Sequence, residues 1–446
     1  MDADRRCLAW LWLFLLAVYL LTMAGRLVSG DGETMYLTTK ALLTRGELAI
    51  EARAETAEGR EGRAYSKYGL GQSVAQAPFF VAGHAVGTLF GATDDRPTRF
   101  AVGMTNSVVT ATLAGVFWLL LRQLGSGRGA ATVASLVLGL ATLAWPYARA
   151  DFAEPLQATM LLLALYGLVR WRRQPTLAWA ALTGAAAGAA VLTKVASVIL
   201  LPPLGLYFAV ALWERFGKPN PPRGRPSALR AFTRLPGAGR GTPADGSPVG
   251  VTRSPARQRP TWADLLAQVP PFPVEKGARG LGPLPHLAAA ALPFALCVAF
   301  QAALNVYRFG SVAEFGYGDE PATGFTTPVL EGIGNLLFSS GKGLFFFAPP
   351  IVLGLAMLPQ LARRYALEAA VVALIFLSEL LYYARWWAWH GDWCWGPRYL
   401  VVTVPFLMVG WGTLLSAWRQ SPLLLRAGAG LLAGAGFGVS LLGVAI

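Results

Sequence analysis

The sequence is short of charged residues and of cysteine, and both shortages exclude classes of protein. Only 14% of its 446 residues are charged, against about 25% in soluble domains, while 54% are hydrophobic. The three cysteines, Cys7, Cys297 and Cys394, lie far apart along the chain. This spacing gives no basis for a disulfide framework or for the paired spacing of a zinc site. The composition is therefore that of an integral membrane protein.

Positive charge exceeds negative charge by a formal +14, which in a soluble protein would suggest nucleic-acid binding. In a membrane protein the cytoplasmic loops carry an excess of Lys and Arg, so we expect cytoplasmic anchoring and no nucleic-acid partner. Arg5 and Arg6 precede a long apolar run from Leu8 to Met23, and no small-residue cleavage site follows. We expect this run to be an uncleaved first span whose N-terminus lies in the cytoplasm.

Apolar stretches of about 20 residues are long enough to cross a bilayer. A further apolar stretch, 70–91, contains Gln72, Gln76 and His84. If it spanned, every later basic cluster would lie outside, so the positive-inside rule favours a juxtamembrane segment. The predicted fold class is thus an all-α polytopic membrane protein with about 11 transmembrane helices and juxtamembrane helices in the first outer loop. The predicted spans are 8–27, 99–121, 130–148, 153–170, 177–193, 195–213, 285–305, 344–361, 366–384, 399–417 and 423–445.

A segment rich in Arg, Pro and Gly, 214–284, divides the chain. It has little apolar periodicity, which is typical of disorder, and its charge suits the cytoplasmic face of the membrane. It could be a docking tail, but a solvated linker between two bundles of spans is the simpler interpretation. We predict an N-terminal module, 1–213, whose first outer loop is 28–98, and a C-terminal module, 285–446, with aromatic outer loops.

The first outer loop begins with two acidic residues, Asp31 and Glu33, directly after the first span. Desolvation near hydrocarbon raises the pKa of a carboxyl group and makes it a better base. Apolar residues at helical spacing follow from Tyr36, so a short interfacial helix could fix both carboxylates at the membrane surface. Asp31 could also serve only as the N-cap of that helix.

Two lysines stand out because lysine is rare, with six residues against 32 arginines. Lys67, followed by Tyr68, precedes the juxtamembrane segment and could bind a phosphate as a point charge or snorkel to the interface. Lys194 lies between two apolar runs with almost no loop. An ammonium at this depth needs a counter-charge, which a carboxylate or a bound phosphate would supply.

The second outer loop holds Arg149, Asp151 and Glu154 at the mouth of a span. Acidic residues so close to hydrocarbon are costly, and they are usually functional or paired. These residues could bind substrate, or Arg149 could simply pair with one of the two acids.

The late outer loops are aromatic and polar. Lys342 lies between two glycines, and five tryptophans occur within ten residues that end at Trp395. An aromatic belt at the interface explains some of these residues but not the accompanying His390, Asp392 and Arg398. Flat aromatic faces also stack on sugar rings and cover polyprenyl chains, and Arg398, which opens the next span, could hold a phosphate.

Outer carboxylates, outer cations and aromatic surfaces together suggest one task. A base is needed for an acceptor hydroxyl, cations are needed for a phosphate leaving group, and apolar grooves are needed for a lipid carrier. No nucleotide is available on the outer face, so sugar transfer there uses lipid-linked donors. We therefore predict transfer of a sugar from a polyprenyl-phosphate carrier to an acceptor hydroxyl.

The same motifs resemble membrane glycosyltransferases of the GT-C superfamily, in the branch of the protein O-mannosyltransferases and aminoarabinose transferases. The string Asp31-Gly32-Glu33-Thr34-Met35-Tyr36 is similar to the acidic motif of that family, usually Asp-Glu followed by Tyr, with Gly32 interposed. The Thr-Lys step at Lys194, Gly-Lys-Gly-Leu-Phe around Lys342 and Trp-Gly-Pro-Arg-Tyr from Trp395 are also similar. The resemblance covers most of the chain except 214–284.

This resemblance implies an inverting single displacement in which Asp31 or Glu33 is the general base, with Asp31 favoured. Lys67, Lys194 and Arg398 would stabilise the departing polyprenyl phosphate. Asp151 and Glu154 would bind the sugar, the acceptor or a divalent cation, so metal dependence stays open. The residues expected to bind substrate or lipid phosphate are Tyr36, Lys67, Tyr68, Arg149, Asp151, Glu154, Lys194, Lys342, Trp395 and Arg398.

The implied partners are a polyprenyl-phosphate-linked sugar, the lipid bilayer, and an acceptor that is a protein, a lipid or a polysaccharide. The implied location is a bacterial plasma (inner) membrane, with the active site extracytoplasmic. The rival interpretation is a transporter or flippase of lipid-linked saccharides. Such a protein often buries charges at the bilayer midplane and contains inverted repeats, but the chain has few midspan charges, of which Glu379 is the clearest, and no obvious repeat.

Overall fold

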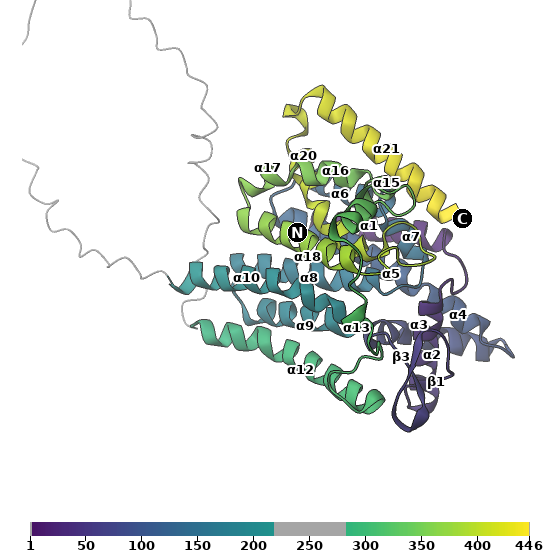
Figure 1. Ribbon diagram of the computed structural model, residues 1–446. Helices are drawn as coiled ribbons and strands as arrows, with labels where there is room; N and C mark the ends of the chain where they lie inside the picture. Colours follow the sequence, from purple (N-terminus) through teal and green to yellow (C-terminus); the bar gives the residue numbers. More distant parts are fainter. Residues whose placement is uncertain (1, 218–281, 446) are drawn as a thin grey trace, which may run out of the picture.

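The computed structural model describes residues 2–217 and 282–445, and most of these residues are helical (Figure 1). The predicted linker, 214–284, lies almost wholly outside the described residues. On its N-terminal side the helices are α1 (Asp2–Leu21), α2 (Gly30–Arg45), η1 (Arg60–Gly62), α3 (Leu70–Leu89), α4 (Arg96–Gly103), α5 (Thr105–Gln123), α6 (Arg128–Leu140), α7 (Ala144–Arg149), α8 (Glu154–Arg173), α9 (Leu177–Thr193), η2 (Val195–Leu200), α10 (Leu201–Leu212) and η3 (Trp213–Gly217).

The second set of helices begins after the linker. It consists of α12 (Pro283–Phe309), α13 (Glu320–Thr323), α14 (Val329–Phe338), α15 (Leu344–Phe347), α16 (Pro350–Ala356), α17 (Leu358–Ala362), α18 (Ala366–Arg385), η5 (Arg398–Thr403), α19 (Val404–Leu407), α20 (Val409–Ser416), η6 (Trp418–Gln420) and α21 (Leu423–Ala445). Short pieces replace one predicted span, 344–361, because Pro349, Pro350 and Pro359 interrupt its backbone hydrogen bonding.

Six helical segments of the described chain are long and apolar enough to cross a membrane. The protein is therefore a multi-pass membrane protein by length and composition, as predicted, but the count of eleven spans is not confirmed. Four shorter apolar helices lie between them, at Arg128–Leu140, Leu177–Thr193, Val329–Phe338 and Pro350–Ala362. The six candidate spans are Arg96–Gln123, Val195–Gly217, Pro283–Phe309, Ala366–Arg385, Arg398–Ser416 and Leu423–Ala445.

The first outer loop contains a small sheet, so the prediction of a purely α-helical chain is wrong here. Three strands, β1 (Ala49–Ile50), β2 (Thr56–Glu58) and β3 (Ala64–Ser66), pair antiparallel in the order β1-β3-β2, with Ala49 opposite Tyr65. Strands of two or three residues are too short to show the alternation of apolar and polar residues that identifies a strand. The sheet is anchored because Tyr65 is buried in a cluster with Leu48, Leu70 and Leu304.

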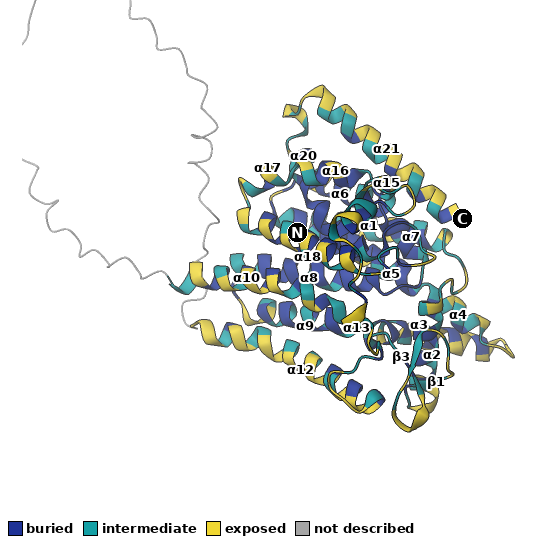
Figure 2. Cartoon of the chain, viewed as in Figure 1, coloured by how far each residue is buried: buried dark blue, intermediate teal, exposed yellow. Residues whose placement is uncertain are grey.

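One apolar core joins the helices that precede the linker to those that follow it. Its largest fully buried side chains include Trp118, Trp171 and Tyr207 from the first set and Phe406 from the second. Buried residues concentrate in the middle of the bundle, whereas α12 and α21 at its edges expose most of their surface (Figure 2). In a membrane protein such an exposed apolar surface faces lipid.

The close packing of α12 on α9 places the end of α12 beside the first outer loop. Gly184 and Gly188 of α9 lie directly against Ala290 and Cys297 of α12, where an added Cβ would overlap the Ala290 carbonyl oxygen or the Cys297 side chain. Small residues allow this approach of two membrane helices. The last turn of α12 thereby reaches β3 and the start of α3, since Arg308 donates to the Ser66 and Tyr68 carbonyl oxygens.

Candidate active site

A cavity of about 320 Å³ lies among the loops that were predicted to be outer loops. Its walls come from the first turn of α2, the loop before α3, the junction of α9 and η2, the end of α12, and the Trp-rich loop that leads into η5. Segments from both sides of the linker therefore build one site. Of the site residues predicted from the sequence, those that line the cavity are Asp31, Lys67, Tyr68, Lys194 and Arg398.

Four charged side chains form a continuous chain of ion pairs at this cavity. Arg398 pairs with Asp31 on one side and, through Nε, with Oε1 of Glu154 at 2.8 Å on the other. Lys194 Nζ contacts the same Glu154 oxygen at 2.8 Å. The expectation that Lys194 needs a counter-charge is thus confirmed, and the fully buried Glu154 supplies it.

Local backbone structure explains how these side chains reach one another. The N-cap of α2 is Ser29, whose Oγ accepts from the Gly32 N–H at 2.9 Å, so the alternative of Asp31 as the N-cap is wrong. Asp31 instead lies in the first turn of α2. Lys194 follows the last residue of α9 with an extended backbone (φ −152°, ψ 117°), which turns its side chain away from the helix axis.

Aromatic rings contact Lys194 and Arg398. Tyr383 and Tyr399 stack with their ring centroids 4.0 Å apart, and Lys194 Nζ lies 4.7 Å from the Tyr399 centroid. The Arg398 guanidinium lies 4.1 Å from the ring centroid of Phe152. These are cation–π distances, so the rings of Tyr399 and Phe152 help to hold Lys194 and Arg398 in place.

Two tyrosines face Asp31 and keep their protons. Burial, and after it the charge of Asp31, raises the pKa of Tyr317 to about 12. The same two causes, in the same order, raise the pKa of Tyr68 well above its ordinary value. Both phenols line the cavity as neutral groups that can donate a hydrogen bond.

The sequence interpretation missed Arg308, which also lines the cavity. Arg308 is 5% exposed, and its guanidinium donates to the carbonyl oxygens of Ser66 (2.9 Å) and Tyr68 (3.2 Å) and to Asn305 Oδ1 (3.1 Å). No ion pair joins Arg308 or Lys67 to a carboxylate within the part of the chain that the structure describes. The sequence signal that could have identified Arg308 is the helical spacing of Gln301, Asn305 and Arg308 on one face of α12.

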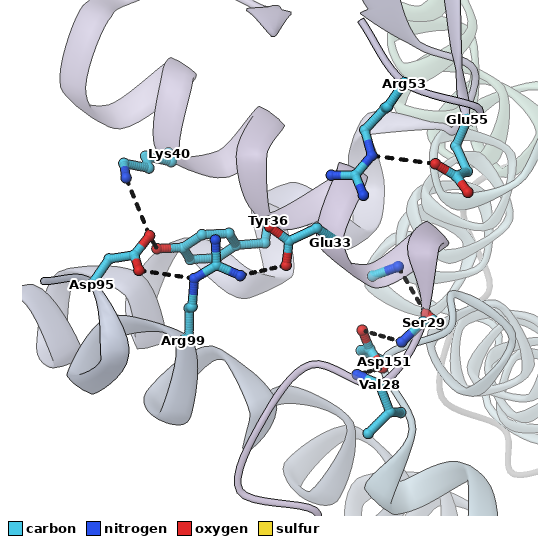
Figure 3. Close-up of polar contacts among 11 residues, drawn as sticks. Val28, Ser29, Glu33, Tyr36, Lys40, Arg53, Glu55, Asp95, Arg99 and Asp151 are labelled. Carbon is cyan, nitrogen blue, oxygen red and sulfur yellow. Dashed lines mark hydrogen bonds and ion pairs between the residues drawn. The ribbon is translucent and has the colours of Figure 1, made fainter. Parts of the chain in front are cut away.

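Two predicted residues of α2, Glu33 and Tyr36, do not line the cavity and point toward α4 (Figure 3). Glu33 pairs with Arg99, and the Tyr36 hydroxyl donates to Asp95 Oδ2 at 2.9 Å. Arg99 also pairs with Asp95 at 2.9 Å, and its guanidinium lies 4.6 Å from the Tyr36 ring centroid. Of the two acids in the motif, only Asp31 faces the cavity.

The remaining predicted residues hold backbone or pack outside the cavity lining. Arg149 donates to the Val444 carbonyl oxygen of α21, so the alternative in which it pairs with Asp151 or Glu154 is wrong. Lys342 Nζ donates to the carbonyl oxygens of Asp392 and Cys394, both at 2.7 Å. Trp395 packs edge-on against Phe347.

Asp151 and Glu154, expected to bind sugar, acceptor or a divalent cation, take different partners. Asp151 accepts from the backbone N–H groups of Val28 and Ser29 (Figure 3), whereas Glu154 accepts from Lys194 and Arg398. Burial raises the pKa of Asp151 to about 6, although these backbone hydrogen bonds act to lower it. Within 2–217 and 282–445, no three Asp, Glu, His or Cys side chains cluster so as to hold a metal ion.

The helical bundle and its outer-loop cavity define a class of protein. The chain has a fold similar to those of the solved ArnT and AglB structures, as the resemblance to the GT-C superfamily predicted. The profile of the family described as dolichyl-phosphate-mannose-protein mannosyltransferase matches residues 93–227. No curated protein matches the sequence significantly.

Two solved structures carry the comparison of folds. ArnT from Cupriavidus metallidurans bound to undecaprenyl phosphate is 15% identical, with a TM-score of 0.52 over 94% of this chain and 61% of that chain. The archaeal oligosaccharyltransferase AglB from Archaeoglobus fulgidus, in complex with an inhibitory peptide and a dolichol-phosphate, is 12% identical, with a TM-score of 0.50. That match covers 99% of this chain and 55% of AglB. The chain is thus similar to these proteins over little more than half of their length.

Proposed function

We propose that this protein is a glycosyltransferase that moves a sugar from a polyprenyl-phosphate carrier to an acceptor hydroxyl on the extracytoplasmic face of the membrane. The observation that carries the proposal is one cavity in which the Asp31 carboxylate faces a group of cations. The GT-C fold and the likeness to ArnT bound to undecaprenyl phosphate support it. The acceptor would be a protein, a lipid or a polysaccharide.

The charges of the cavity indicate where the donor phosphate would bind. Asp31 and Glu154 already neutralise Arg398 and Lys194. Lys67 and Arg308 have no such carboxylate among the described residues. Arg308 is buried and Lys67 is half-buried, and a buried charge without a counter-charge is costly. A phosphate between these two cations would remove that cost, so we assign the donor phosphate to Lys67 and Arg308, with Arg398 and Lys194 beside it.

The proposed reaction is a single displacement. Asp31 accepts the proton of the acceptor hydroxyl as the hydroxyl oxygen attacks the anomeric carbon of the sugar. The bond from that carbon to the phosphate oxygen breaks, and the polyprenyl phosphate leaves with the electron pair. Cations placed at the leaving phosphate stabilise the charge that develops there, and attack from the opposite side inverts the anomeric configuration.

The decisive comparison is between Asp31→Asn and Glu33→Gln in membranes supplied with a labelled polyprenyl-phosphate sugar. We expect Asp31→Asn to lose about 100-fold or more in transfer, the contribution typical of a general base, while it still binds undecaprenyl phosphate. Glu33→Gln should lose far less, because Glu33 faces Arg99 and not the cavity. Glu51→Ala removes an exposed carboxylate of the same loop and is the matched control.

Full transfer by Asp31→Asn would contradict the assignment of the base. A flippase would give neither loss nor retention of transfer in Asp31→Asn, since it would move the lipid across the membrane without breaking the sugar–phosphate bond.

A further inference from the structure

Asp151 is buried, at 7% exposed, and is not among the residues that line the cavity. Its Oδ1 accepts from the Val28 N–H at 3.0 Å, and its Oδ2 accepts from the Ser29 N–H at 3.4 Å (Figure 3). These two residues immediately precede α2, whose first turn carries Asp31. Asp151 therefore holds the start of the helix that positions the proposed base.

Gly32 provides the room for this contact. A Cβ added at Gly32 would overlap the Asp151 carboxylate, so no other residue fits while Asp151 keeps its place. The glycine between Asp31 and Glu33 thus has a steric explanation in this chain. The Asp151 carboxylate occupies the space that a side chain at position 32 would fill, so the two residues are complementary in size.

The segment 150–154, which carries Asp151, is held by side chains of neighbouring elements. Asn106 of α5 donates through Nδ2 to the carbonyl oxygens of Ala150 (2.6 Å) and Phe152 (2.7 Å). The Gln72 amide of α3 donates to Asn106 Oδ1 at 3.0 Å. At the far end of the segment, Glu154 holds Arg398 and Lys194.

We propose that Asp151 is a positioning residue that, together with Gly32, sets the location of Asp31 relative to the Arg398–Glu154 pair. The segment 150–154 connects the two: Asp151 holds the N-terminus of α2, and Glu154 holds Arg398 and Lys194. This inference rests on the proposed function, because positioning matters only if Asp31 is the base. Displacement of a reacting group by about 1 Å can cost about 100-fold in rate.

The test compares Asp151→Ala and Asp151→Asn with the control Glu51→Ala in the full-length protein. We expect Asp151→Ala to lower kcat of sugar transfer about 10- to 100-fold. The KM for the donor and the affinity for undecaprenyl phosphate should change less than about twofold, because Lys67 and Arg308 are not held by 150–154. Asp151→Asn should be intermediate, since its amide oxygen can still accept from one backbone N–H.

A pair of substitutions that exchanges a small and a large residue at positions 32 and 151 tests whether Asp151 acts by positioning or only by packing. Gly32→Ala alone should lower the Tm of the purified protein, because its methyl group meets the Asp151 carboxylate. The double variant Gly32→Ala/Asp151→Gly should recover the Tm of Asp151→Gly but not the wild-type kcat, since the bonds to Val28 and Ser29 are gone. Recovery of kcat by the double variant would overturn the proposal and leave Asp151 as a packing residue.

A kcat for Asp151→Ala within about twofold of the wild type would also overturn the positioning role. That failure differs from failure of the proposed function, in which Asp31→Asn itself retains transfer. The Tm of Gly32→Ala and of the double variant tests the complementary pair without any assay of activity.

Discussion

Single residues in the cavity differ chiefly in how their charge is compensated. Arg398 and Arg308 are both buried arginines, yet Arg398 lies between two carboxylates whereas Arg308 has backbone and amide oxygens as partners. A bound phosphate would therefore gain more from Arg308 than from Arg398. Charge-assisted hydrogen bonds contribute about 1.5–3 kcal/mol each.

Arg308→Ala tests this difference at the residue scale. We expect its affinity for undecaprenyl phosphate to fall about 10- to 100-fold, in line with the loss of one or two charge-assisted hydrogen bonds. Binding is measured with the purified protein by titration of the lipid, and Arg60→Ala, which removes an exposed arginine of the first outer loop, is the control. Unchanged affinity in Arg308→Ala would place the phosphate elsewhere in the cavity.

At the scale of elements, α2 is held at two places. Asp151 holds its N-terminus, while α4 holds its outer face through the network of Arg99, Glu33, Asp95 and Tyr36 (Figure 3). The side chains of Arg99 and Glu33 are 31% and 22% exposed. Solvent screens such pairs, and exposed ion pairs contribute about 0.2–1 kcal/mol.

Arg99→Ala should therefore have a smaller effect than Asp151→Ala. We expect a lower Tm by a few degrees and a modest loss of kcat, because Tyr36 remains buried and keeps α2 on α4. Arg96→Ala is the matched control on the same helix, since Arg96 is exposed and its carboxylate partner is Asp94. If Arg99→Ala lowered kcat as much as Asp151→Ala, the outer face of α2 would matter as much as its N-terminus.

The packing of α12 on α9 is a second determinant at this scale, because α12 carries Arg308 to the cavity. Gly184→Ala should destabilise the protein by about 1–3 kcal/mol, the usual effect of forcing an extra group into a packed interface, since its methyl group would meet the Ala290 carbonyl oxygen. Gly205→Ala on α10 points into open space and should be neutral or slightly stabilising. Thermal unfolding of the two variants in detergent makes the comparison. Equal Tm values would mean that α9 and α12 are less tightly packed than the structure indicates.

At the scale of the whole molecule, the basic ends of the helices lie together with the N-terminus. Arg122 and Arg128, which flank the turn between α5 and α6, pair with Asp4 of α1 at 3.0 and 3.2 Å. From the positive-inside rule we predict that this end lies in the cytoplasm. We then expect the cavity and the first outer loop on the opposite side of the membrane.

Labelling of single cysteines in intact cells tests this orientation. In a variant whose three native cysteines are replaced by serine, Glu51→Cys should react with a membrane-impermeant maleimide from outside. Arg364→Cys, exposed in the turn before α18, should react only after the membrane is permeabilised. The reverse pattern would place the cavity in the cytoplasm, where a lipid-linked donor is not required.

Much of the helical fold and part of the site could be predicted from the sequence for local reasons. Long apolar runs identify membrane helices because every backbone group in lipid must be bonded within the segment. Charges that interrupt such runs are costly, so Asp31, Lys67, Lys194 and Arg398 could be recognised one by one. The strands of the first outer loop and the breaks at 344–361 carried no comparable signal.

Local patterns along the chain thus identify a membrane protein and the charged residues that lie beside its apolar runs. The packing of the helices determines which of these residues contact one another. Glu154 and Arg398 are 244 positions apart, and Arg308 reaches the Ser66 carbonyl oxygen across 242 positions. Such partners depend on helix packing between distant segments, which leaves no periodic trace in the chain. For the same reason, the contact of Gly32 with Asp151 became visible only when the helices were in place.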